Sequence, residues 1–172
     1  MSTKEELVER ASEYTLRHGR VLGRELGFGV HGIVFVTKSQ RRKKGTAARS
    51  AIKVYLHEAE YCRERDVYLR LQEKAVTSIR GCHVPKLLRH DDELWIIEMT
   101  VVSRPFVLDF AGAFLDKPPD FSEEVMADWR AEKQEQFGSR WPEVEAILRA
   151  LEGHGVYYID VAPRNISLPD AT

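Results

Sequence analysis

The sequence predicts an α+β protein of two small lobes, a strand-rich lobe followed by a helix-rich one. Between residues 20 and 100 the chain is rich in alternating and β-branched residues, whereas beyond residue 105 the apolar residues recur at helical spacing. A length of 172 residues leaves room for one substantial core rather than two full domains. We therefore divide the chain into an N-terminal helix (1–19), a first lobe (20–102) and a second lobe (103–172).

The first lobe is predicted from residue periodicity and from its glycines. Apolar residues repeat at about 3.6-residue spacing in its helices and alternate or cluster in its strands. Gly19 is a stop signal for the leading helix. The expected elements are a helix over 3–18, two strands within 20–38, a strand over 50–55, a helix over 58–74, and a hairpin of strands over 84–88 and 94–99.

The second lobe is expected to be mainly helical from residue 105 onward. Pro118 and Pro119 break it, and a long helix follows over 142–152 with Gly153 as its stop signal. Two short β-like pieces, 156–159 and 166–168, then flank a polar loop.

Charge and cysteine content exclude several classes of protein. Lys and Arg number 26 against 27 Asp and Glu, so the net charge of −1 argues against a dedicated nucleic-acid binder. The two cysteines are not arranged as a disulfide scaffold or a zinc ribbon, and no stretch is apolar enough to span a membrane. We expect a soluble, cytoplasmic protein with no membrane partner. The basic segment 38–49 is either a solvated hairpin loop or an attachment point for an acidic partner.

Gly27, Gly29 and Gly32 fit the pattern Gly-x-Gly-x-x-Gly. The pattern lies between two predicted strands, whereas the dinucleotide-binding fingerprint runs from a strand into a helix. A glycine loop between strands, followed here by Val34, instead resembles the flap that covers nucleotide phosphates in kinases. On its own the pattern is also what an ordinary tight turn produces.

Lys53 lies in the apolar strand that follows this loop. A lysine there costs desolvation energy unless it is paired, and Glu64 on the next helix is the expected partner. The alternative is a lysine at a strand end that extends its charge to solvent. Asp160 and Asn165 frame the polar loop after the long helix, where such residues either form turns or serve catalysis.

Together these residues resemble, in kind and order, the motifs of the protein-kinase-like superfamily, over residues 26–168. The resemblance implies a two-lobed fold with an antiparallel N-lobe sheet, an αC-like helix and a reduced C-lobe, and it implies ATP and Mg²⁺ as cofactors. The roles implied for nucleotide binding are phosphate contact by Lys53 paired with Glu64, phosphate cover by Gly27, Gly29 and Gly32, an adenine pocket of Val34 and Ala51, a gatekeeper at Ile97, and hinge hydrogen bonds from the backbone of Glu98 and Thr100.

In the same way the resemblance implies that Asp160 orients or deprotonates the attacking hydroxyl and that Asn165 ligates Mg²⁺. The chain departs from the family pattern after this point. It contains no Asp-Phe-Gly triplet, and seven residues follow Asn165. Asp170 is the downstream carboxylate among them, either as a turn residue after Pro169 or as a substitute metal ligand. Ala162 stands where serine/threonine kinases carry a lysine.

These departures leave three hypotheses open. The first is an atypical, minimal protein kinase that transfers the γ-phosphate of ATP to a hydroxyl of an unknown protein or small molecule. The second is a pseudokinase or scaffolding module that keeps the fold without catalysis. The third is that the chain is a fragment whose C-terminal portion was removed, or whose C-lobe is completed by a partner or a second subunit.

Overall fold

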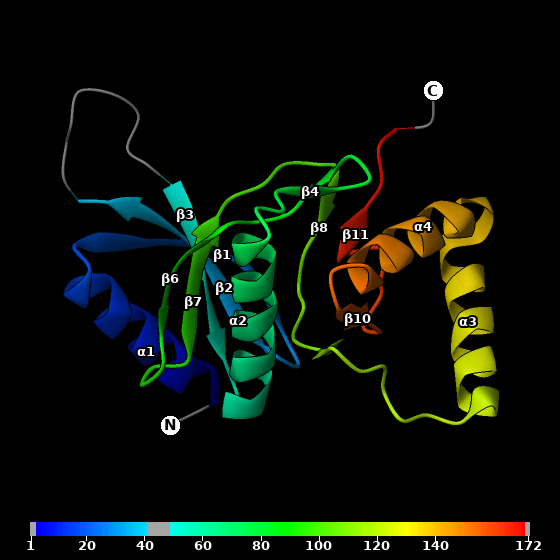
Figure 1. Cartoon of the computed structure of the whole chain (residues 1–172). Helices are drawn as coiled ribbons and strands as arrows, with labels where there is room; N and C mark the ends of the chain where they lie inside the picture. Colours follow the sequence, from blue (N-terminus) through cyan, green and yellow to red (C-terminus); the bar gives the residue numbers. More distant parts are fainter. Residues whose placement is uncertain (1–2, 41–48, 171–172) are drawn as a thin grey trace. The chain divides into compact units, whose positions relative to one another are not determined.

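The computed structural model describes residues 3–40 and 49–170, which form an α+β protein (Figure 1). The α+β class predicted from the sequence is therefore confirmed. The chain divides into two compact units, of which unit 1 comprises Met1–Arg65 with Lys86–Val101, and unit 2 comprises Asp66–Pro85 with Val102–Thr172. The leading helix belongs to unit 1, and each unit is described separately below.

Unit 1 is built on a five-stranded antiparallel sheet in the order β1-β2-β3-β7-β6. The first turns of α2 (Glu58–Glu73) also belong to it. Its other elements are α1 (Thr3–Arg17), β1 (Arg20–Gly29), β2 (Gly32–Ser39), β3 (Arg49–Tyr55), β6 (Leu87–Asp91) and β7 (Ile96–Thr100).

The helix α1 covers one face of this sheet. Leu7, Ala11 and Tyr14 are spaced three and four residues apart, so they share one side of the helix, and all three are buried. They form one apolar cluster with residues of three strands and the β6–β7 turn, namely Ile33, Phe35, Ile52, Val54, Leu94 and Ile96. This cluster is the core of unit 1.

The hairpin predicted over 84–99 is present, but its strands are shifted in sequence. Leu94 and Trp95, expected in the second strand, belong to the turn, where Trp95 has a φ of +49°. The Asp91 carboxylate accepts hydrogen bonds from the backbone N–H groups of Glu93 and Leu94 at 3.0 and 2.9 Å. Because aspartate closes turns in this way, β6 continues to Asp91 and β7 begins only at Ile96.

Unit 2 combines helices with two small sheets. One sheet pairs β10 with β9, and the other has the order β11-β8-β5-β4 with a parallel β5–β8 pair. Besides the end of α2, its elements are β4 (Ser78–Ile79), β5 (Cys82–His83), β8 (Phe106–Val107), β9 (Ala113–Leu115), α3 (Glu123–Phe137), the 3₁₀ turn η1 (Gly138–Arg140), α4 (Trp141–Glu152), β10 (Val156–Tyr158) and β11 (Ile166–Ser167).

The prediction of helix directly after Pro105 is wrong. Residues 106–107 and 113–115 are the strands β8 and β9, and the first helix of this region, α3, begins at Glu123. Each strand pairs with a segment far along the chain, β8 with β11 and β9 with β10. These long-range hydrogen bonds override the weak helical spacing of the segment.

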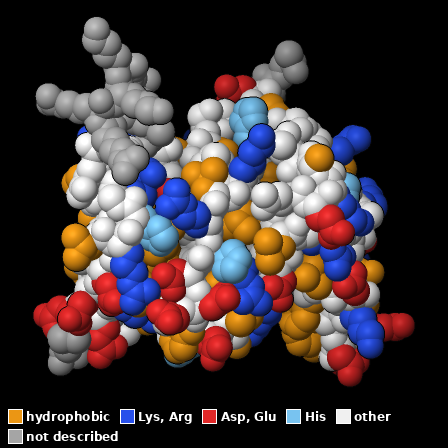
Figure 2. All heavy atoms as spheres, turned by 60° about the vertical axis from the view of Figure 1, so that its left-hand side comes forward, with side chains coloured by type: hydrophobic (Ala, Val, Ile, Leu, Met, Phe, Trp, Pro, Cys, Tyr) orange, Lys and Arg blue, Asp and Glu red, His pale blue; other side chains and the backbone are white. Residues whose placement is uncertain are grey.

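The surface carries charges of both signs, in keeping with the near-neutral net charge. Figure 2 shows one face of the molecule on which basic and acidic side chains are interspersed with exposed apolar ones. In the basic segment 38–49, residues 41–48 lie outside the described part of the chain. Among the helices that the structure describes, none combines the length and apolar character needed to cross a bilayer.

Candidate functional site

Four of the residues expected to line a nucleotide site share one face of the unit 1 sheet, opposite α1. Val34 pairs with Lys53 across β2 and β3, and Lys53 pairs with Ile97 across β3 and β7. Directly paired residues point to the same side of a sheet, as do residues two apart in one strand. Val34, Lys53, Ile97 and Ala51 therefore form one continuous patch, which we call the lysine face.

Lys53 forms the predicted ion pair with Glu64. Its Nζ lies 2.6 Å from Glu64 Oε2, Lys53 is 5% exposed and Glu64 is fully buried. The same Nζ lies 4.9 Å from the centre of the Tyr55 ring, within range of a cation–π contact. Since α2 brings Glu64 to the lysine face, the strand and the helix together hold one buried positive and one buried negative charge.

The glycine hairpin, residues 27–32, is a tight turn in which Gly29 pairs with Gly32. Gly32 has a φ of +141°, and a Cβ there would lie 1.9 Å from the carbonyl oxygen of Val54. The fold therefore requires glycine at position 32. At Gly27 and Gly29, by contrast, an added Cβ would meet no atom within 4 Å. Packing within the described residues gives no reason for glycine at these two positions.

His31, at the tip of the hairpin, is held against α2. Its Nδ1 lies 3.1 Å from Glu60 Oε1, an ion pair when the imidazole is protonated. Its carbonyl accepts a hydrogen bond from the N–H of Leu56 at 3.1 Å. Glu60 precedes Glu64 by one helical turn, so neighbouring carboxylates of α2 contact the hairpin and β3.

Glu98 and Thr100 were expected to belong to the hinge between the two lobes. In the structure both lie inside β7. The N–H of Thr100 donates to the carbonyl oxygen of Lys86 at 2.9 Å, which extends the sheet by one residue beyond the expected strand end. The chain leaves unit 1 only after Val101. A hydrogen bond from the Thr100 N–H to adenine would therefore compete with the bond that this N–H already makes to Lys86.

The Glu98 side chain has a structural environment that the sequence did not indicate. It is 1% exposed and faces α1, because it pairs with Ile52 of the core. It accepts hydrogen bonds from Tyr14 at 2.8 Å and Ser50 at 2.6 Å, and Arg20 Nε lies 3.1 Å away. Burial, and then the charge of Glu98 and the hydrogen bond to it, raise the pKa of Tyr14. We call these four residues the Glu98 network.

In unit 2 the polar loop 160–165 is closed by its own hydrogen bonds. The Asn165 side chain, 2% exposed, donates from Nδ2 to the Asp160 carbonyl oxygen at 3.1 Å, so its amide oxygen is the end able to bind a cation. Backbone N–H groups of Asn165 and Ile166 both donate to the carbonyl of Ala162. Gly112 packs against Asp160, since a Cβ at Gly112 would lie 2.8 Å from the Asp160 Cβ.

Asp170 is not brought to this loop by any contact that the structure describes. It is exposed beyond β11, and its charge acts on Arg140. Within residues 3–40 and 49–170, no three His, Cys, Asp or Glu side chains gather as they do in a metal site. Asp160 and Asn165 are therefore the oxygen ligands that one loop offers together.

Comparison of the chain with models of known protein families gave no match, and comparison with curated proteins gave none.

Proposed function

We propose that the chain is an ATP-binding phosphotransferase of the protein-kinase-like type, whose nucleotide binds on the lysine face of unit 1. The observation that carries this proposal is the buried Lys53–Glu64 pair on the lysine face, in register with Val34 and Ile97. An apolar patch with one fixed ammonium group suits a flat base attached to a charged phosphate chain.

The buried Lys53–Glu64 pair favours a role in ligand binding, because a buried ion pair adds little to the stability of a fold. Two charges removed from water cost several kcal/mol each, and apolar residues of similar size at such sites are often as stable or more so. Around Lys53 the face is apolar, with Val34, Ala51 and Ile97 as neighbours. We infer that the pair is kept because Lys53 contacts phosphate oxygens while Glu64 holds its orientation.

The glycine hairpin supports the same function. Gly27 and Gly29 have open space where a side chain would stand, and glycine lets backbone N–H groups approach an anion closely. In this proposal the backbone at Gly27 and Gly29 lies over the phosphates. Gly32 serves the hairpin itself, through its contact with Val54.

Loop 160–165 would provide the remaining groups. Mg²⁺ at such sites keeps most of its ligands from phosphates and water, so the Asn165 amide oxygen can serve as the protein ligand that this loop gives it. When bound, the Mg²⁺–ATP complex supplies the phosphoryl group and neutralises its charge. Asp160 would orient the acceptor hydroxyl and take its proton, while Asn165 keeps the loop closed through its bond to the Asp160 carbonyl.

A second candidate function is a nucleotide-binding module without transfer. The observation that favours it is the placement of Asp170, which is exposed with its charge acting on Arg140. Without a second carboxylate, the γ-phosphate is held less firmly than in enzymes that have one. This candidate keeps the role of Lys53 and Glu64 and removes that of Asp160.

The two candidates are separated by Asp160→Asn. For the transferase we expect release or transfer of the γ-phosphate of radiolabelled ATP to fall by about 10² or more, because the general base is lost, while ATP affinity stays the same. Asp128→Asn on α3 is the matched control and should transfer at the wild-type rate. If the wild type binds ATP but transfers no phosphate to water, to itself or to a panel of acceptors, the second candidate replaces the first.

A further inference from the structure

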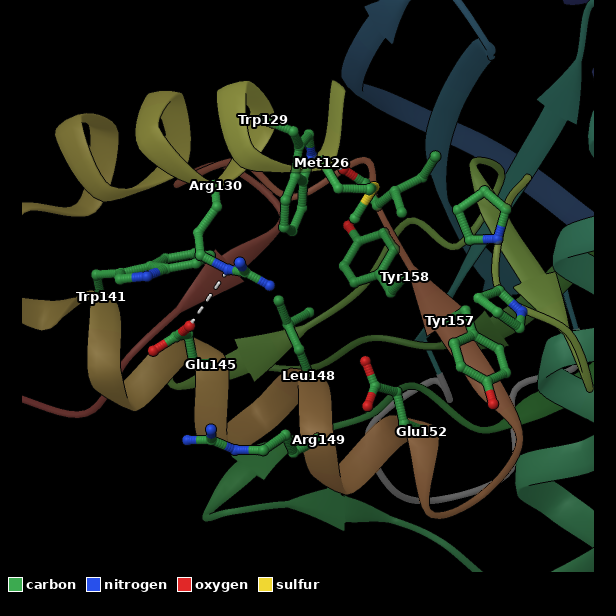
Figure 3. A pocket seen from close by; sticks show the side chains of 13 residues that line it. Met126, Trp129, Arg130, Trp141, Glu145, Leu148, Arg149, Glu152, Tyr157 and Tyr158 are labelled. Carbon is green, nitrogen blue, oxygen red and sulfur yellow. Dashed lines mark hydrogen bonds and ion pairs between the residues drawn. The ribbon is translucent and has the colours of Figure 1, made fainter. Parts of the chain in front are cut away.

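Unit 2 contains a pocket of about 310 Å³ that shares no residue with the proposed nucleotide and transfer groups. It lies among α3, α4 and β10 (Figure 3). Its size is at the lower end of the range found for small-molecule sites. Its wall includes four aromatic side chains, Trp129 from α3, Trp141 from α4, and Tyr157 and Tyr158 from β10.

Several of these rings are fixed in orientation by the protein. The Trp129 indole N–H donates to the carbonyl oxygen of Ile159 at 3.0 Å, and the Tyr158 hydroxyl donates to that of Leu108 at 3.1 Å. Trp129 and Trp141 meet edge to face, with centroids 6.1 Å apart. The aromatic wall is therefore preformed, and a ligand does not have to order it.

The pocket is lined by two arginines and two glutamates, which balance in number but are unevenly distributed. Arg130 from α3 turns toward Glu145 on α4, with Nε 3.9 Å from Oε1, so this pair contributes little net charge (Figure 3). Arg149 extends along α4 away from the two tyrosines in the same view. Glu152 lies on their side of the pocket. Within residues 3–40 and 49–170 its carboxylate has no cationic side chain at ion-pair distance.

We propose that this pocket binds a small organic cation with an aromatic or apolar body. The ammonium group is attracted to the Glu152 carboxylate and to the faces of Tyr157 and Tyr158, since aromatic rings attract cations through their negative faces. The body packs against the indole rings and Leu148. This inference goes beyond the proposed phosphotransferase function and does not depend on it.

The pocket is tested with three soluble probes that share a phenylethyl body: phenethylamine, phenethyl alcohol and 3-phenylpropionate. Binding to the whole chain is followed by the indole N–H signals in ¹H–¹⁵N NMR spectra. We expect phenethylamine to shift the signals of Trp129 and Trp141 and to leave that of Trp95, which lies in unit 1, unchanged. Phenethylamine should bind about tenfold more tightly than the alcohol, and the propionate more weakly still.

The charge preference should disappear in Glu152→Gln, an exposed position where the change leaves packing intact. Glu135→Gln, an exposed change on α3 outside the pocket, is the control and should keep the preference. The proposal is overturned if the propionate binds as tightly as the amine, if Glu152→Gln keeps the preference, or if no probe shifts the two signals at millimolar concentration. None of these outcomes depends on ATP, so the two proposals fail separately.

Discussion

The two faces of the five-stranded sheet in unit 1 each bury a glutamate, but they surround it differently. Toward α1, Glu98 receives hydrogen bonds from Tyr14 and Ser50 and an ion pair from Arg20, at the margin of a large apolar cluster. Toward α2, Glu64 holds Lys53, which is itself buried in an apolar patch. Neighbouring strand positions, such as Ile52 and Lys53, thus belong to different environments.

The difference teaches which buried charge serves the fold. Several donors shared by one carboxylate tie α1 to three strands, so the Glu98 network locks the helix against the sheet. A single ammonium–carboxylate pair between β3 and α2 adds little that apolar residues would not. We therefore assign the α1 face to stability and the lysine face to ligand binding, and the following predictions test that division.

The largest effect is expected from Glu98→Ala. Loss of the carboxylate leaves the buried Tyr14 hydroxyl without its acceptor and the nearly buried Arg20 guanidinium without its counter-charge, although Ser50 and Arg20 keep their hydrogen bonds to Thr37. The cost should be about 3–5 kcal/mol in the free energy of unfolding. Urea denaturation at neutral pH measures this. Glu93→Ala, which removes an exposed partner of Arg17, is the control. Equal losses in the two variants would mean that Glu98 does not lock the helix.

Next in size is Lys53→Met, which should cost about 3 kcal/mol because the buried Glu64 carboxylate loses its partner. Adding Glu64→Leu should recover most of that loss, since the site then holds two apolar residues. The same urea series gives the double-mutant cycle. A double variant as unstable as Lys53→Met would show that the pair stabilises the fold, and the division between the two faces would not hold.

Within the glycine hairpin, Gly32→Ala should cost about 1–3 kcal/mol, because its φ is positive and the new Cβ would overlap the Val54 carbonyl. Gly27→Ala should change stability by only a few tenths of a kcal/mol, since the space there is open. Its effect should instead appear as weaker ATP binding. If Gly27→Ala alters stability as much as Gly32→Ala and leaves ATP binding intact, the hairpin has no role at the nucleotide.

The smallest effect concerns pH. Because the pKa of Tyr14 is raised in the folded state, an unfolded tyrosine ionises first, at about pH 10, and stability falls as the pH rises beyond that value. At pH 7 the free energy of unfolding of Tyr14→Phe should be about 1 kcal/mol lower than that of the wild type. Between pH 9 and pH 11, however, the free energy of unfolding of the variant should fall less steeply than that of the wild type. Tyr61, whose pKa is raised mainly by burial, still contributes in both proteins. Urea midpoints across this range provide the measurement, and parallel declines would contradict the Tyr14 assignment.

Local patterns predicted those parts of the fold whose partners lie close in sequence. The glycine turn between β1 and β2 and the apolar spacing of α1 and α2 follow from neighbouring residues, and their bounds agree closely with prediction. Strands β8 and β9 did not follow, because each is only two or three residues long and pairs with a distant segment. Periodicity cannot be read from so few residues.

In the candidate site, too, contacts between neighbouring elements were predictable and contacts between distant ones were not. Pairing of Lys53 with Glu64 was predictable, since a buried lysine demands a carboxylate and the next helix offers one. The Glu98 side chain was missed because its partners come from α1, β1, β3 and β6, and no local pattern connects them. Its one signal was a glutamate within the apolar run 94–99.

The central claim, that the lysine face binds ATP, is tested most directly by calorimetric titration with ATP, with and without Mg²⁺. The wild type is compared with the double variant Lys53→Met/Glu64→Leu, whose stability should be close to that of the wild type. We predict Mg²⁺-dependent binding by the wild type and affinity at least about tenfold weaker in the double variant. Equal affinities, or no heat of binding in the wild type, would contradict the claim.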